Sequence, residues 1–255
     1  MTTHQLKISE LVKNGTLIRN KVPEFEYDHV FVYGHWRMFY TLEGDTAPKN
    51  AHDSDHDGIP DYIASMLFKF EPARILFCEA YFLDDPTTSG FYFSHGVQYI
   101  DVYIQNIPRP KGLVSNRVFD NHYGILENTP FQGKSLLVRI DRDLMAMTSV
   151  PMHELFHFFQ FNYTQIANLW FMEGIARWSQ LIFQNRSIPH YRLPSTQQEL
   201  DQLFDFAHGA EVFWNRLSDL CAQPNEFSLP ISLRDNDLII GKNRTGIKLI
   251  REFLY

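Results

Sequence analysis

The chain has 255 residues, of which 44% are hydrophobic and 21% charged, a length and composition typical of a globular protein with a large core. The net charge is −7 and lysine and arginine form no run, which argues against a nucleic-acid partner. The two cysteines, Cys78 and Cys221, lie far apart in apolar contexts, so a disulfide framework or a cysteine-based metal site is not expected.

The N-terminal segment contains no basic stretch followed by an apolar core, so no secretory signal peptide is expected. No window of the chain reaches the roughly 20 apolar residues that a membrane span requires. The sequence therefore predicts a protein that is cytoplasmic as synthesised. Export by a route that needs no leader peptide would not be recognisable from the sequence.

The first half of the chain is predicted to mix strands and helices. Residues 61–82 have helical periodicity, which we expect to be interrupted or restarted at Pro72. Residues 106–133 are rich in Pro, Gly and Asn and predict a long surface loop. Strands are predicted at residues 29–33 and 36–42, as a hairpin, and at residues 91–94, 98–105 and 135–140.

From residue 148 onward the pattern becomes helical. Ser195 and Thr196, followed by Glu199, form a favourable helix start. Helices are predicted at residues 148–163, 172–183, 195–207, 211–221 and 245–254. Strands followed by helices indicate an α+β architecture. We expect a single domain over residues 1–255, with an N-terminal lobe of mixed sheet and helix (1–164) and a mainly helical C-terminal lobe (165–255).

The segment HELFH matches the pattern H-E-x-x-H and is the first candidate for chemistry. In a helix, His153 and His157 lie one above the other on one face, so both imidazoles can reach one metal ion. Glu154 lies one step round the helix, where it can take a proton from metal-bound water. Apolar neighbours predict a buried helix, in which these polar groups need a metal or a partner. The alternative is two core histidines satisfied by hydrogen bonds.

A catalytic zinc site usually has three protein ligands and one open position. A metzincin would have Gly and His three and six residues after His157, but Gln160 and Tyr163 occupy those positions. Glu173, at the start of the next predicted helix and followed by small residues, is therefore the candidate third ligand. The alternative role for Glu173 is an acid favoured by the helix dipole.

A loop of alternating aspartates, DSDHDGIPD at residues 53–61, is the second candidate site. Calcium takes six to eight oxygen ligands, and alternating acids around a glycine can supply them. An EF-hand would need Glu where Ala64 stands, so this loop is of another kind. The alternative is a solvated acidic turn before a helix. The candidate calcium ligands are Asp53, Asp55, Asp57, Ile59 and Asp61.

The order of these features resembles a bacterial family of zinc metallopeptidases of the zincin, gluzincin-like type, with a thrombospondin-type-3-like calcium loop before the catalytic helix. The similar segments are WRMFYTLEGDTA (36–47), DSDHDGIPDY (53–62), YIDVYI (99–104), HELFHFFQFNY (153–163), LWFMEGIARWSQ (169–180) and, more weakly, HGAEVFWNRLSDL (208–220). The resemblance implies a zincin-like fold, peptidase activity, zinc, and Glu173 as third ligand. Relatives differ in carrying a signal peptide and an acid after the residue that matches Trp178.

The resulting hypothesis is metal-assisted hydrolysis of a peptide or protein substrate, with Glu154 as general base. The candidates for stabilising the oxyanion are His208, Tyr191 and His190. Two alternatives stay open. One is a non-catalytic zincin-shaped module, stabilised by calcium, that binds a partner protein as an effector does; the other is a hydrolase for a non-peptide amide.

Overall fold

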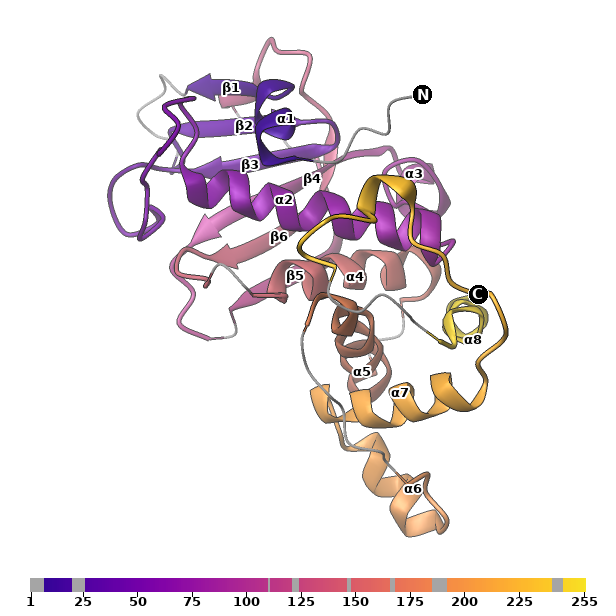
Figure 1. Cartoon of the computed structure of the whole chain (residues 1–255). Coiled ribbons are helices and arrows are strands. Elements are labelled where there is room, and N and C mark those ends of the chain that lie inside the picture. The colour runs from indigo at the N-terminus through magenta and orange to yellow at the C-terminus, as the bar shows by residue number, and fades with distance from the viewer. Residues whose placement is uncertain are drawn as a thin grey trace.

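The computed structural model describes residues 7–19, 26–109, 111–120, 124–145, 148–165, 168–184, 192–239 and 245–255. The fold is α+β, with a mixed sheet at the N-terminal end and helices toward the C-terminus (Figure 1). The strands are β1 (Thr16–Arg19), β2 (His29–Tyr33), β3 (Trp36–Tyr40), β4 (Val97–Gln105), β5 (Gly112–Phe119) and β6 (Lys134–Asp141). The predicted hairpin of β2 and β3 is confirmed, and so are β4 and β6.

The strands form one sheet in the order β1-β2-β3-β4-β6-β5. The central strands β3, β4 and β6 run parallel to one another, whereas the outer pairings are antiparallel. β5 therefore lies at one edge of the sheet with a hydrogen-bonded neighbour on one side, β6. This edge borders the candidate site described below.

The helices are α1 (Ile8–Lys13), α2 (Asp61–Ile75), α3 (Gly90–Ser94), α4 (Val150–Tyr163), α5 (Leu169–Ser179), α6 (Gln197–Phe204), α7 (Glu211–Leu220) and α8 (Ile247–Leu254). Short 3-10 turns occur at Gly124–Leu126, Gln180–Phe183, His208–Ala210 and Ile231–Leu233. Thr196 and Glu199 form a complete capping box at the start of α6, as the sequence predicts. No helix of the described ranges is long and apolar enough to cross a membrane.

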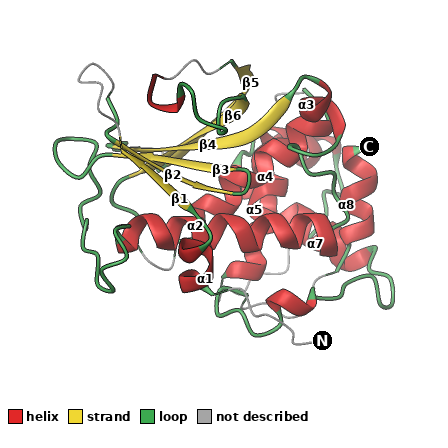
Figure 2. Ribbon diagram, turned by 90° about the horizontal axis from the view of Figure 1, so that it is seen from above, coloured by secondary structure: helices red, strands yellow, loops and turns green. Residues whose placement is uncertain are grey.

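Helices α2 and α4 lie on the same face of the sheet (Figure 2), and the main apolar core fills the space between them and the strands. α4 is buried over most of its length because its sequence is apolar on nearly every side. The opposite face of the sheet carries a smaller cluster, formed by Val30, Val32 and Phe39 with Tyr27 and Leu126.

The strand predicted at residues 91–94 is wrong, because these residues form helix α3. The aromatic residues there favour a strand locally. The amide oxygen of Asn162, on α4, accepts a hydrogen bond from the backbone N–H of Tyr92 at 3.1 Å and satisfies the start of the short helix. A contact between segments 70 residues apart therefore overrides the local preference.

The restart predicted at Pro72 is also wrong, since α2 continues through Pro72 and ends in a π-helical turn at Leu76–Ala80. Proline removes one hydrogen bond from a helix interior and introduces a clash. Pro72 is buried, and the adjoining residues of α2 are packed in the main core. We attribute the continuity of the helix to this packing, which offsets the loss of one hydrogen bond.

The long loop predicted at residues 106–133 is wrong in part, because it contains β5. An edge strand pairs on one side only and many of its side chains face solvent, so β5 lacks the alternation that reveals a strand. The pairing with β6, which the sequence does not display, makes it a strand.

A buried ion pair links β3 and β4 at the centre of the sheet. Arg37 of β3 and Asp101 of β4 are cross-strand neighbours, both 0% exposed, and the Arg37 Nη2 donates to Asp101 Oδ2 at 2.8 Å. Asp101 also accepts a hydrogen bond from Ser135 Oγ at 2.7 Å. We expect Asp101→Ala to lower the free energy of unfolding by about 3–5 kcal/mol, because it leaves the guanidinium charge buried without its counter-ion.

Urea unfolding followed by circular dichroism measures this loss of stability. Lys49→Ala is the control, because its ion pair with Asp143 is exposed and such pairs contribute about 0–1 kcal/mol. Equal midpoints for the Asp101 variant and wild type would show that the pair is not needed for stability.

Candidate metal centre

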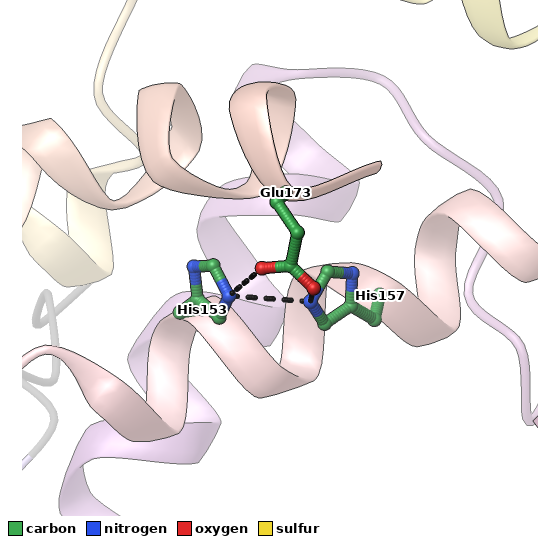
Figure 3. Close-up of side chains that lie close together, drawn as sticks. All are labelled: His153, His157 and Glu173. Atoms are coloured by element: carbon green, nitrogen blue, oxygen red, sulfur yellow. Dashed lines mark hydrogen bonds and ion pairs between the residues drawn. The ribbon is translucent and has the colours of Figure 1, made fainter. Parts of the chain in front are cut away.

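Two helices bring His153, His157 and Glu173 together. The histidines lie one turn apart on α4, and Glu173 points down from α5 toward both rings (Figure 3). The two Nε2 atoms are 3.2 Å apart, and Glu173 Oε2 lies 3.1 Å from His153 Nε2. Glu173 Oε1 lies 3.6 Å from His157 Nε2. The three side chains converge as the sequence predicts, and Glu173 does not turn away from the histidine pair.

The spacing of these atoms fits a metal ion. Ligand atoms held tetrahedrally at zinc–ligand distances of about 2.0–2.1 Å lie roughly 3.3 Å from one another. The 3.2 Å between the two Nε2 atoms and the 3.1 Å from His153 Nε2 to Glu173 Oε2 are close to that value, and the other carboxylate oxygen lies 3.6 Å from His157 Nε2. Two imidazole nitrogens and one carboxylate are also the ligand set of several zinc hydrolases. The residues present therefore fit a zinc ion.

Gln160, one turn beyond His157 on α4, sets the tautomer of that histidine. The Met172 carbonyl can only accept a hydrogen bond, so the Gln160 Nε2 donates to it at 3.0 Å. The Gln160 Oε1 then faces His157 Nδ1 at 2.9 Å and accepts a hydrogen bond from the Nδ1–H. In the neutral ring this leaves the Nε2 lone pair directed at Glu173, as a metal ligand requires. Sequence reasoning missed this role, although the i, i+3 spacing from His157 is its signal.

Close packing between α5 and the following segment adds a third histidine. A Cβ on Gly174 would lie 2.8 Å from the Ala210 Cβ and 2.7 Å from the Trp214 side chain, so only glycine permits this approach. The approach brings His208 to the site, where its Nε2 lies 3.0 Å from Glu173 Oε2 and its ring stacks on His153 at 5.4 Å. His208 therefore lies at the centre, and its role in stabilising the oxyanion stays a prediction. His190 and Tyr191 lie outside the described residues.

Glu154 is not part of the ligand cluster but lies beside it, 8% exposed. The first residue of β5, Gly112, covers it: a Cβ there would lie 2.6 Å from both Cγ and Oε1 of Glu154. Burial raises the pKa of the Glu154 carboxyl to about 7. A carboxyl with this pKa can exchange protons near neutral pH.

Burial and mutual contacts shift the pKa values of the three candidate metal ligands, His153, His157 and Glu173. Burial by itself would raise the pKa of Glu173, but its contacts with His153, His157 and His208 outweigh burial and hold that pKa far below its usual range. Burial lowers the pKa of His153 to about 4, so its ring is neutral at physiological pH. Burial also acts to lower the pKa of His157, but its contacts with Glu173 outweigh this and raise it. Glu173 is therefore the permanent negative charge of the centre.

A cavity of 270 Å³ opens beside these side chains. Its lining includes polar side-chain atoms of five residues: Glu154, Glu173, His153, His157 and His208. Its remaining walls are the backbone at Gly112 and the apolar side chains of Leu113, Val114, Phe161, Leu169 and Met172. The cluster is thus accessible to a ligand from outside.

The aspartate loop brings three of its predicted calcium ligands together. Carboxylate oxygens of Asp53, Asp55 and Asp61 all lie within 4.8 Å of one another. Asp57 is not in this group; its Oδ1 accepts a hydrogen bond from the Ile59 backbone N–H at 2.8 Å. Ile59 itself is buried in the core, which anchors the loop to the body of the protein.

Comparisons of the chain with models of protein families, with curated proteins and with solved structures gave no match. The chemistry of the site is therefore inferred from its own residues.

Proposed function

We propose that the chain is a zinc-dependent metallopeptidase of the zincin, gluzincin-like type. The observation that carries the proposal is the convergence of two Nε2 atoms and one carboxylate, 3.1 to 3.6 Å apart, next to a fourth group, Glu154, that stays outside the cluster. A purely structural metal site has no use for that additional carboxylate. The resemblance of the motif order to known zinc metallopeptidases supports the same conclusion.

His153, His157 and Glu173 would hold the zinc ion, which when bound polarises the scissile carbonyl and lowers the pKa of water toward about 7. Glu154 takes a proton from the attacking water and later delivers it to the leaving amine. Its raised pKa suits both transfers near neutral pH. His208 stands at the cavity wall and can donate a hydrogen bond to the oxyanion. β5, as an edge strand at this cavity, can pair with an extended substrate.

The direct test is cleavage of casein by the purified protein, with and without a zinc chelator. Cleavage that stops on chelation and returns with added zinc supports the proposal. Binding of a protein without cleavage would instead favour the non-catalytic module, and cleavage of simple amides but not peptides would favour the other hydrolase.

Gly112 offers a test of how Glu154 is positioned. We expect Gly112→Ala to push the Glu154 carboxyl aside, because the new methyl group would overlap it, and to lower the rate of peptide hydrolysis by about 100-fold, the cost of roughly 1 Å of misplacement. Zinc content and melting temperature should change little, since a flexible side chain can yield. Arg117→Ala, exposed on the same strand, is the control. An unchanged rate for Gly112→Ala would contradict this role of Gly112.

We also propose that the aspartate loop binds a structural calcium ion through Asp53, Asp55 and Asp61. Three carboxylates within 4.8 Å repel one another unless a cation lies between them. Asp57 and Ile59, the other predicted calcium ligands, would bind the ion only if their segment rearranges. The Asp57 Oδ1 accepts a hydrogen bond from the Ile59 backbone N–H.

Calcium at 100 times its dissociation constant would stabilise the fold by about 2.7 kcal/mol, and we expect the melting temperature to rise by roughly 5–11 °C. The measurement is differential scanning fluorimetry, with calcium added to protein that has been treated with EGTA, dialysed and reloaded with zinc. Asp55→Asn, an exposed change, should remove most of the shift, whereas Asp28→Asn outside the loop should not. If calcium has no effect on wild type, the loop is an ordinary acidic turn.

A further inference from the structure

Large exposed apolar side chains line the cavity, and others lie on the segment that leads to His208. Leu113 on β5 is 41% exposed and Leu169 at the start of α5 is 63% exposed, and both line the cavity. Phe204, the last residue of α6, is 46% exposed, and Phe206, two residues later, is 39% exposed. We call these four residues the apolar rim. Apolar side chains exposed together at a functional opening mark a binding surface, because covering them is favourable.

The members of the apolar rim are connected through the structure. The ring of Trp170, the residue after Leu169, lies 5.2 Å from the ring of Phe204. Phe206 lies two residues before His208, the histidine that contacts Glu173. The contact of Trp170 with Phe204 and that of His208 with Glu173 hold the segment that carries Phe204 and Phe206 against α5. Leu113 and Leu169 line the cavity itself.

The interior of the cavity is also lined by apolar side chains. Val114, Phe161 and Met172 provide its apolar walls. The carboxyl groups that line it within the described ranges are Glu154 and Glu173, and no lysine or arginine of those ranges does. The volume of 270 Å³ lies just below the 300–1,000 Å³ typical of pockets for drug-sized molecules, which suits a single side chain. Apart from the proposed zinc ion, an acidic side chain would meet two carboxyl groups there and no lysine or arginine of the described ranges.

We infer that the substrate is an extended chain segment rich in apolar residues. One apolar side chain fills the cavity beside the scissile bond, and its neighbours cover the apolar rim. This inference rests on the proposed peptidase function and specifies the class of substrate. Leu169 is the specificity-determining residue most open to testing, since its exposure means that a substitution disturbs little packing.

The experiment compares two fluorogenic peptides of equal length that differ only beside the scissile bond, one carrying Leu and Phe and the other Glu and Asp. For wild type we expect kcat/KM to be at least about tenfold higher for the apolar peptide, the lower end of discrimination by one apolar pocket. Leu169→Lys should narrow the ratio several-fold by attracting the acidic peptide and losing apolar contact. Ile231→Lys, at an exposed aliphatic residue that does not line the cavity, should leave the ratio unchanged.

Equal kcat/KM values for the two peptides, or a ratio that Leu169→Lys and Ile231→Lys alter alike, would overturn the inference. A second measurement does not depend on turnover: the anisotropy of the same labelled peptides with zinc-loaded Glu154→Gln protein. Tighter binding of the apolar peptide, reduced by Leu169→Lys, supports the inference even if wild type cleaves neither peptide. In that case the peptidase function fails while the apolar site stands. Equal or absent binding of both peptides overturns the site itself.

Discussion

Glu154→Gln is expected to retain zinc but to lower the rate of peptide hydrolysis by about 10²–10⁴-fold, the usual contribution of a general acid–base group. The carboxyl lies outside the ligand cluster, so removing its charge takes no ligand from the metal. Glutamine has nearly the same shape and fits beneath Gly112, but its amide cannot take a proton from water. Initial rates on casein and a fluorogenic peptide, with zinc content by elemental analysis, measure both effects.

The matched control is Glu127→Gln, an exposed glutamate beyond the cavity, which should keep the wild-type rate. If Glu154→Gln and wild type cleave peptides equally fast, Glu154 is not the general base. Loss of zinc together with loss of rate would mean that Glu154 acts on the metal site and not on the proton.

His157→Ala is expected to abolish stoichiometric zinc binding and with it all hydrolysis. The change removes one of two imidazoles that converge at 3.2 Å and leaves two ligands, too few for a stable site. Gln160→Ala should have a graded effect, weakening zinc binding by about 10–100-fold, because it releases the His157 ring without removing it. Competition with a fluorescent zinc chelator measures the zinc affinities of wild type and of the two variants.

His95→Ala removes the imidazole of an exposed histidine directly after α3 and serves as the control. A zinc affinity of His157→Ala equal to that of wild type would falsify the proposed ligand set. The affinities of Gln160→Ala and His157→Ala must also differ; if they coincide, His157 does not ligate directly.

The raised pKa of His157 gives this site a pH dependence of defined sign. Its contacts with Glu173 hold a proton on the ring to a higher pH than the ordinary value of about 6.5. Zinc must displace that proton, so its affinity should fall as the pH is lowered from about 8 to about 6. The same competition assay at several pH values checks this; an affinity that stays constant over the range would contradict it.

The sequence predicted that His153, His157 and Glu173 lie together because these residues follow a local rule. His153 and His157 share a helix face through their i, i+4 spacing alone, whatever the rest of the fold does. Glu173 could be named because the next helix follows after a short loop, which makes the two helices neighbours. The hairpin of β2 and β3 was predictable for the same reason, since its signal lies within a dozen residues.

The errors occurred where distant residues decide the local structure. α3 is a helix because Asn162 bonds to Tyr92 from another element, and β5 is a strand because β6 lies beside it. Neither partner is visible from the segment itself. Gln160 was similarly overlooked, because its function depends on a carbonyl of α5 as well as on its spacing from His157.

By itself the sequence determined which side chains can bind a metal and which can act as a base, since both follow from residue type and helical spacing. Only the tertiary structure decided that Gly112 covers Glu154, that His208 reaches Glu173, and that exposed apolar residues surround the cavity. These features depend on close approach between elements far apart in the chain. Such approach is fixed by packing of the whole core, which no local pattern of residues encodes.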